Sequence, residues 1–275
     1  MEKGKKIKIA AAGLAVVLAV AALNNRLVVR QYTLPVTEGS LRMLLLSDLH
    51  SFIHGNDQRD LISMVIGQKP DVILLAGDIA DDHMPFKGTE LLLKGIKGIP
   101  TFYVTGNHEY WSDDAEDVKA AMAALGVTVL EDEYVELEIN GIPLLIAGIE
   151  DPMKRAVYLS YDQEKSMASA FSGISRDDGR YKILLAHRPE KIERYLVYPF
   201  DLVVSGHSHG GQVRIPFLLN GLYSPNQGFF PKYAGGVYKH GALTHIVSRG
   251  IGIDFSLWRV FNPPEIVVIN LKSGA

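Results

Sequence analysis

Short apolar runs that end in polar clusters recur along most of the chain. A continuous apolar run of about four to eight residues, bounded by turn residues, is typical of a buried strand. Helical patterns follow these runs, which predicts an α/β domain with parallel crossovers. The first three runs are Arg42 to Ser47, Val72 to Ala76 and Thr101 to Thr105, and they end at Asp48, Gly77-Asp78 and Gly106-Asn107.

Later runs change the predicted strand pairing. Tyr134 to Ile139 and Leu144 to Ile149 are joined by Asn140-Gly141, a strong hairpin signal, so antiparallel pairing is expected there. Ser112 is the predicted N-cap of a helix that reaches about Leu125. Further strands are predicted at Val127 to Leu130, Tyr181 to Ala186, Asp201 to Ser205, Thr244 to Val247 and Glu265 to Leu271, and a mostly helical stretch from Asp151 to Ser172. No repeat or composition shift marks a second domain, so residues 41–275 are predicted to form one domain.

The first 25 residues have a different pattern. Four lysines precede Ile9 to Leu23, a run with no charged residue and no polar face. Its length is close to the lower end of the roughly 17 to 25 residues that span a bilayer as a helix. Residues 1–25 are therefore predicted to be a hydrophobic membrane anchor, with a cleaved signal segment and a buried helix as alternatives, and residues 26–40 a polar linker. The lysine excess predicts a single-pass protein with the domain outside the cytoplasm, and secretion or a domain on the cytoplasmic face are the alternatives.

Composition narrows the chemistry. The chain has 275 residues, 47% hydrophobic and 21% charged, which fits a globular protein with a sizeable core. A net charge of -3 and a pI near 6.3 give no basic stripe, so no nucleic-acid partner is expected. Because cysteine is absent, disulfides, thiolate zinc sites and cysteine nucleophiles are excluded. Any bound metal must have nitrogen and oxygen ligands.

Side chains that can bind metals follow the predicted strands. Ligands of open α/β sheets gather at the carboxyl ends of the strands, so these residues can meet in one crevice. His207 and His209 are two residues apart, and alternate residues of an extended chain point to the same side. Singly, such an Asp is usually a cap and such a His a half-buried ring. The set is Asp48, His50, Asp78, Asn107, His108, His187, His207 and His209.

This set resembles the calcineurin-like metallophosphoesterase family over about residues 42–272. The matching blocks are Asp48-Leu49-His50, Gly77-Asp78-Ile79-Ala80-Asp81, Gly106-Asn107-His108-Glu109, His187 and Gly206-His207-Ser208-His209. The resemblance implies a four-layer α/β/β/α sandwich with two metal ions at the strand ends. It also implies two ligand sets that share Asp78 as the bridging ligand: Asp48, His50, Asp78 and His209 for one metal, and Asp78, Asn107, His187 and His207 for the other.

The donor set makes chemical sense. Two divalent cations bring four positive charges and the two aspartates return two, so the cluster stays cationic and attracts phosphate. Such a site lowers the pKa of a bound water from about 15.7 towards about 7, which predicts attack on phosphorus by a metal-bridging hydroxide. Nitrogen and oxygen ligands fit Mn, Fe or Zn.

The family resemblance also implies two catalytic residues. His108 would protonate the leaving oxygen or stabilise the transition state as a cation. Asp81 would orient its imidazole, with a helix cap as the alternative role. Glu109 is expected to be structural, and Asp82 a solvated neighbour.

The expected substrate is a phosphodiester, phosphomonoester or pyrophosphate. The Arg-Gly that follows the second block in protein phosphatases is absent, whereas Gly210-Gly211-Gln212 resembles a small, membrane-targeted branch with phosphodiesterases and UDP-2,3-diacylglucosamine pyrophosphate hydrolases. An aromatic, apolar segment from Ile215 to Tyr233 favours a lipid-linked or cell-envelope substrate, with packing on the sheet as the alternative. The rival functions are a nuclease or nucleotide phosphodiesterase of the same fold, and a non-catalytic metal-binding or phospholipid-binding pseudoenzyme.

Overall fold

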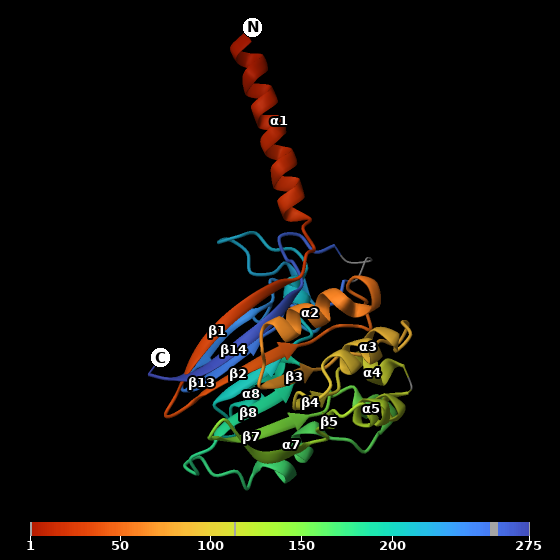
Figure 1. Ribbon diagram of the computed structural model, residues 1–275, viewed down its shortest axis with the longest axis vertical. Helices are drawn as coiled ribbons and strands as arrows, with labels where there is room; N and C mark the ends of the chain where they lie inside the picture. The colour runs from red at the N-terminus through yellow and green to blue at the C-terminus, as the bar shows by residue number, and fades with distance from the viewer. Residues whose placement is uncertain (1, 113, 254–257, 275) are drawn as a thin grey trace.

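Two six-stranded sheets pack face to face in the computed structural model, which describes the chain except residues 1, 113, 254–257 and 275 (Figure 1). The first sheet contains, in order, β1 (Val28–Val36), β14 (Glu265–Ser273), β2 (Ser40–Leu46), β3 (Val72–Ala76), β4 (Thr101–Val104) and β5 (Thr128–Val129). The second contains β12 (Gly236–His240), β13 (Leu243–Val247), β9 (Leu202–Ser205), β8 (Tyr181–Ala186), β7 (Ile142–Ile149) and β6 (Glu133–Ile139). The strands β10 (Tyr223–Ser224) and β11 (Gly228–Phe229) form a separate two-stranded antiparallel ribbon.

Helices cover the outer face of each sheet. The helices are α1 (Glu2–Ala22), α2 (Arg59–Gly67), α3 (Lys87–Gly95), α4 (Asn107–Trp111), α5 (Ala115–Ala124), α6 (Lys154–Val157), α7 (Gln163–Phe171) and α8 (Ile192–Tyr195), with 3-10 turns at Asn56–Gln58, Pro189–Lys191 and His209–Gly211. Apolar side chains of α2, α3 and α5 pack on the first sheet, and those of α7 and α8 on the second. The α/β class is thereby confirmed.

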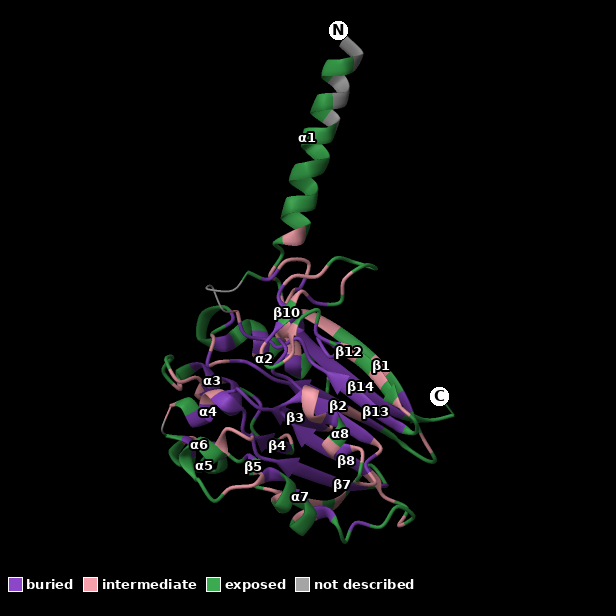
Figure 2. Cartoon of the chain, turned by 180° about the vertical axis from the view of Figure 1, so that it is seen from behind, coloured by how far each residue is buried: buried purple, intermediate pink, exposed green. Residues whose placement is uncertain are grey.

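The inner strands of both sheets, such as β3, β8 and β9, are continuous apolar runs because both of their faces are buried. In β2, Met43 and Leu45 point into the core between the sheets, whereas Leu44 and Leu46 pack under the helices. Figure 2 shows the strands of both sheets as mostly buried. Strands β2, β3 and β4 pair in parallel, and the predicted hairpin at Asn140-Gly141 joins antiparallel β6 and β7.

The predicted linker at residues 26–40 is wrong. Strand β1 lies within it and pairs in parallel with β14 along its whole length, and Leu34 is 5% exposed in the core between the sheets. As the edge strand of its sheet, β1 can carry exposed polar side chains and Pro35 without losing pairing, which hides its strand pattern. The folded domain therefore includes residues on the N-terminal side of position 41.

The predicted N-cap at Ser112 is also wrong. Helix α4 begins at Asn107 and ends at Trp111, and the Ser112 hydroxyl donates a hydrogen bond to the Glu109 carbonyl. Helix α5 starts at Ala115. Two short helices thus replace the single predicted one, because the first starts directly at the end of β4.

Helix α1 extends away from the domain (Figures 1 and 2). Val16 and Leu18, which lie on opposite sides of this helix, are both exposed. Within the described residues, no helix is both long enough and apolar enough to cross a membrane, so the predicted transmembrane anchor is not supported.

Candidate metal centre

The predicted ligands lie at the carboxyl ends of strands from both sheets. Five of them have left-handed backbone conformations, which are unfavourable for residues with a side chain and concentrate at functional sites. These are Asp48, His50, Asp78, His207 and His209, with φ between 45° and 66°. The strand ends therefore turn sharply and direct these side chains into one crevice.

Gly106 allows two of the strand ends to approach closely. A Cβ atom at this position would lie 2.1 Å from Asp78 Oδ1 and 2.6 Å from the backbone nitrogen of Asp78. A residue with a side chain would push the loop after β4 away from the loop after β3. The glycine of the Gly-Asn-His-Glu block thus maintains the spacing between Asp78 and Asn107.

One group of candidate ligands is Asp48, His50 and His209, whose donor atoms all lie within 4.8 Å of one another. The rings of His50 and His209 are stacked with centroids 5.2 Å apart. Asp48 Oδ1 accepts a hydrogen bond of 2.8 Å from the His207 backbone nitrogen. Asp48 Oδ2 and His50 Nε2 are buried with no hydrogen-bond partner among the described residues, so their lone pairs can bind a cation.

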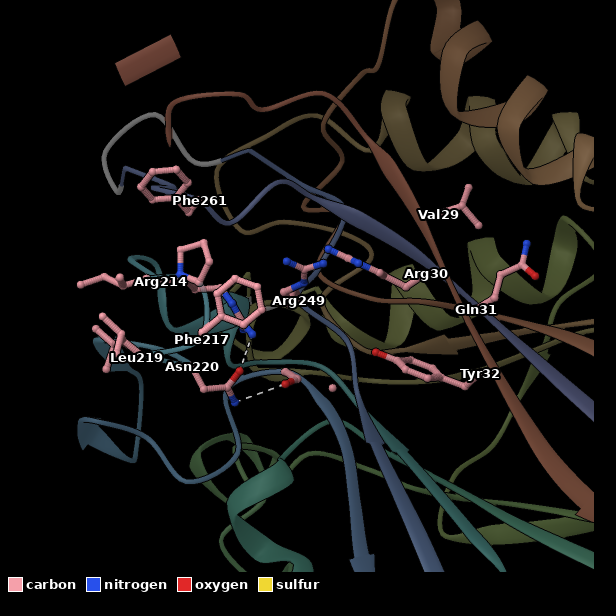
Figure 3. A pocket seen from close by; sticks show the side chains of 15 residues that line it. Val29, Arg30, Gln31, Tyr32, Arg214, Phe217, Leu219, Asn220, Arg249 and Phe261 are labelled. Carbon is pink, nitrogen blue, oxygen red and sulfur yellow. Dashed lines mark hydrogen bonds between the residues drawn. The ribbon is translucent and has the colours of Figure 1, made fainter. Parts of the chain in front are cut away.

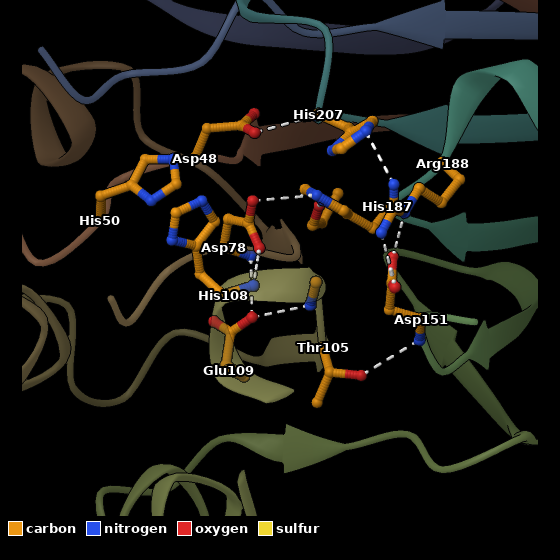
Figure 4. A network of polar contacts seen from close by, with 12 residues as sticks. Asp48, His50, Asp78, Thr105, His108, Glu109, Asp151, His187, Arg188 and His207 are labelled. Carbon is orange, nitrogen blue, oxygen red and sulfur yellow. Dashed lines mark hydrogen bonds and ion pairs between the residues drawn. The ribbon is translucent and has the colours of Figure 1, made fainter. Parts of the chain in front are cut away.

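The second group is Asp78, His187 and His207. His187 Nδ1 donates a 2.8 Å hydrogen bond to the Ala76 carbonyl, which leaves Nε2 facing Asp78 Oδ2 at 3.1 Å (Figure 4). Two lone pairs at this distance repel each other unless a proton or a metal ion lies with them. Asn107 Oδ1 is also buried and unpaired in the described structure. The predicted bridging residue Asp78 lies in this group.

The charges in the crevice suit a cation. Burial raises the pKa of Asp48. Burial acts the same way on Asp78, but the opposing charge of His187 holds the pKa of Asp78 well below its usual range. Burial lowers the pKa of His207 and of His209, which keeps both rings neutral, the form that binds metals. The donor set therefore fits divalent metal ions.

His187 shows how strongly the site attracts positive charge. Burial lowers the pKa of this imidazole, but the charge and hydrogen bond of Asp78 outweigh burial and raise the pKa to about 10. A proton then occupies the position between Asp78 and His187. A metal ion bound by these two side chains would replace that proton.

His108 lies beside the ligands and is held by two carboxylates. Its Nδ1 is 2.7 Å from Asp82 Oδ1 and 3.4 Å from Asp81 Oδ2, while Asp81 is closer, at 3.1 Å, to His50 Nδ1. The expectation that Asp82 is only a solvated neighbour is therefore wrong, and Asp81 contacts both histidines. Burial lowers the pKa of His108, but the hydrogen bond with Asp81 and the charges of Asp78 and Asp82 raise it to about 9. At neutral pH the His108 ring is therefore protonated on both nitrogens and positively charged.

Glu109 is structural, as expected. It is fully buried, and its two oxygens accept hydrogen bonds from four backbone nitrogens at the start of α4 and in the loop after β3. These donors are Gly106, Asp78, Ile79 and Ala80. Glu109 therefore fixes the loop of Asp78 against the loop of Asn107.

Arg188 is the main residue that the sequence analysis missed. It is buried, and its Nε and Nη2 form two hydrogen bonds, of 2.5 and 3.0 Å, with Asp151 (Figure 4). Its Nη1 lies 2.9 Å from His207 Nε2, and Asn226 Oδ1 lies at the same distance from that nitrogen. These contacts hold the His207 ring at its Nε2 atom. The only sequence signal is that Arg188 directly follows His187, because its partners are far away along the chain.

Comparison with known proteins agrees with this architecture. Residues 41–211 match the model of the calcineurin-like phosphoesterase family. Cj0846 from Campylobacter jejuni, an uncharacterized metallophosphoesterase, is 31% identical over 271 residues, which cover 94% of this chain and 68% of the relative. The phosphodiesterase YaeI from Escherichia coli is 28% identical, with coverage of 84% of this chain and 82% of YaeI.

A solved structure shows the same fold. GAP50, the anchor in the inner membrane complex of Plasmodium, has a TM-score of 0.50 at 13% identity, with coverage of 86% of this chain and 82% of GAP50. The matches define a phosphoester hydrolase. The chain belongs to the calcineurin-like phosphoesterase family.

Proposed function

We propose that this protein is a binuclear metal-dependent phosphodiesterase. One cation would be held by Asp48, His50 and His209, the other by Asp78, Asn107, His187 and His207, with Asp78 also reaching the first. The observation that carries the proposal is the convergence of buried donor atoms: Asp48 Oδ2, His50 Nε2 and Asn107 Oδ1 have no hydrogen-bond partner among the described residues, and Asp78 Oδ2 faces His187 Nε2 at 3.1 Å. The phosphodiesterase name of the relative YaeI supports the choice of a phosphodiester.

The protein side chains would divide the remaining work. Divalent cations, when bound here, neutralise phosphate charge and activate water for attack on phosphorus. His108 would donate a proton from Nε2 to the leaving oxygen, because its Nδ1 is occupied by Asp82. Asp81 and Asp82 would keep the imidazole oriented and charged before the transfer, and stabilise it in the transition state.

The aromatic segment Ile215 to Tyr233 supports a lipid-linked or cell-envelope substrate. It borders the candidate site, because the Leu222 nitrogen donates a hydrogen bond to the carbonyl of Gly211, two residues after His209. Phe229 and Phe230 are largely exposed and can contact an acyl chain. The test compares turnover of a nucleotide-diphosphate lipid with turnover of soluble phosphomonoesters. A strong preference for the soluble phosphomonoesters would contradict the lipid-linked substrate and the choice of a phosphodiester, and would leave only a metal-dependent phosphoesterase.

Metal analysis tests the binuclear site. We expect about two metal ions per chain by mass spectrometry, and loss of phosphodiester hydrolysis on chelation. Asn107→Ala should lose the ion of the Asp78 group and nearly all turnover, because one buried oxygen ligand is removed. Asn56→Ala, at an exposed position of a 3-10 turn, is the matched control. It should keep both the bound metal and the turnover of the wild type. Unchanged hydrolysis after chelation or in Asn107→Ala would contradict the proposed function.

A further inference from the structure

A second cavity lies apart from the candidate metal centre. Its volume is about 1040 Å³, and none of the proposed metal ligands lines it. It lies between the edge strands of the two sheets, β1 and β12, and the loop 214–220 closes one side (Figure 3). The cavity is at the end of the domain from which α1 extends: Phe261, one of its lining residues, donates a backbone hydrogen bond of 2.6 Å to Ala22 at the end of α1.

The cavity carries an excess of positive charge. Arg30, Arg214 and Arg249 all line it (Figure 3). Glu265 supplies one carboxylate: Arg249 Nε binds Glu265 Oε2 at 2.6 Å, and Arg30 Nε lies 3.9 Å from the same oxygen. The cavity thus has three guanidinium groups near one carboxylate, which contacts two of them.

Arg214 differs from the other two arginines because it forms no direct contact with Glu265. No carboxylate of the described residues forms an ion pair with it, and its guanidinium donates only to the Asn220 side-chain oxygen and, at 3.4 Å, to the Gly210 carbonyl. Burial lowers the pKa of Arg214 and the nearby charge of Arg249 acts in the same direction, while the more distant charge of Glu265 only partly opposes them. A Cβ atom at Gly235 would lie 2.6 Å from Arg249 Cγ and 3.3 Å from Arg214 Nη1, so this glycine leaves the space in which both arginines lie. A partly buried cation beside another cation binds an anion favourably.

Apolar side chains form the outer edge of the same cavity. Phe217 is fully exposed and Leu218 is 85% exposed, and both line the cavity together with Ile215. The loop that carries them lies near the base of α1, whose apolar side chains are also exposed (Figure 1). A cationic surface that can bind an anion and an apolar surface thus lie next to each other. This arrangement matches an amphiphile with an anionic head.

We propose that this cavity binds the phosphate headgroup of an anionic membrane phospholipid. The phosphate would contact Arg214 and Arg30, and the acyl chains would lie along Phe217, Leu218 and α1. Lipid binding here does not depend on the metal centre, so the proposal stands or fails independently of the proposed hydrolysis.

Short-chain lipids test the cavity without requiring a membrane. Full-length protein in a neutral detergent, freed of metal by chelation, is titrated with dihexanoylphosphatidylglycerol in a calorimeter. We expect saturable binding at least about tenfold tighter than that of dihexanoylphosphatidylcholine or glycerol 1-phosphate. Arg214→Gln should weaken the binding about tenfold, the loss expected for one charge-assisted contact. Arg59→Gln, an exposed change on α2, is the control and should bind like the wild type.

Each other outcome overturns the proposal. Equal affinity for the zwitterionic lipid would remove the role of charge, and equal affinity for glycerol 1-phosphate would make the cavity a site for free phosphate esters. Unchanged affinity in Arg214→Gln would place the lipid elsewhere. If thermal unfolding shows that Arg214→Gln is not folded, the affinity of Arg30→Gln for the same lipid is measured instead. Arg30 is exposed, so this variant should bind the lipid more weakly without a change in the core. Metal-loaded Arg214→Gln should hydrolyse a soluble phosphodiester at the wild-type rate.

Discussion

His108 lies beside both groups of candidate ligands. Replacing it therefore tests the proposed proton transfer separately from metal binding. The ring lies outside the Asp48 and Asp78 groups and forms a third cluster of possible ligands with His50 and Asp81, while Asp82 holds its Nδ1 at 2.7 Å. We expect His108→Ala to lower kcat by about 10² to 10⁴, the usual contribution of a general acid, with both metal ions retained. Steady-state kinetics and metal analysis of the same sample check this. Loss of metal from the variant would show that the ring is a ligand instead.

Arg188 would act on the proposed reaction through His207, whose Nε2 it contacts. Lysine at this position keeps the charge, but it cannot bind both oxygens of Asp151 and reach His207 Nε2 together. We therefore expect Arg188→Lys to reduce metal affinity at the Asp78 group about 10-fold to 100-fold, the usual effect of losing a contact behind a ligand. Metal titration followed by mass spectrometry measures the loss, and Arg155→Lys, at an exposed position of α6, is the control. Equal affinity in both variants would make Arg188 a purely structural residue.

That the candidate ligands lie close together could be predicted from sequence, because each lies in a short local block at the end of an apolar strand. The partners of His108 and His207 could not be predicted in the same way. Asp81 and Asp82 are adjacent in sequence, and only the turn of the chain decides that Asp82 reaches His108 more closely. Asp151 lies on a different strand end from Arg188, so their pairing depends on how β7 and β8 are placed.

At the level of elements, burial on both faces made most strands predictable. Strands β3 and β8 have the predicted bounds, because a strand covered on both sides must be apolar throughout. Strand β1 was missed because it lies at the edge of its sheet and exposes four of its nine residues, including the adjacent Arg30 and Gln31. Its pairing with β14 depends on a strand more than 200 positions away, which no local pattern shows.

Leu34 provides the test of β1. This side chain is 5% exposed and lies in the core between the sheets. We expect Leu34→Ala to lower the free energy of unfolding by about 2 to 5 kcal/mol, because it removes buried apolar surface and leaves a cavity. Denaturant unfolding measures the change, and Thr33→Ala, an exposed neighbour on the same strand, should have an effect smaller than about 0.5 kcal/mol. Similar values for the two variants would mean that this segment does not pack in solution as it does here.

At the level of the whole molecule, the candidate centre joins the two sheets at one edge. Asp48 and Asp78 follow strands β2 and β3 of the first sheet, whereas His187 and His207 follow β8 and β9 of the second. Asp78 Oδ2 of the first sheet's side faces His187 Nε2 of the second at 3.1 Å, and Asp48 Oδ2 and Asn107 Oδ1 are buried without a hydrogen-bond partner among the described residues. Metal binding should therefore stabilise the contact between the sheets as well as prepare the site for chemistry.

Thermal unfolding with and without metal measures this link. A ligand present at 100 times its Kd stabilises the folded state by about 2.7 kcal/mol, which corresponds to a rise in Tm of roughly 5 to 10 °C for a domain of this size. We expect manganese to raise the Tm of the wild type by this amount and a chelator to reverse the rise. Asp78→Asn should lose most of the response whatever its own Tm, because its side chain serves the Asp78 group and is proposed to reach the first ion. If metal analysis shows two bound ions but the Tm does not change, the ions bind where they do not connect the two sheets, and the ligand assignment is wrong.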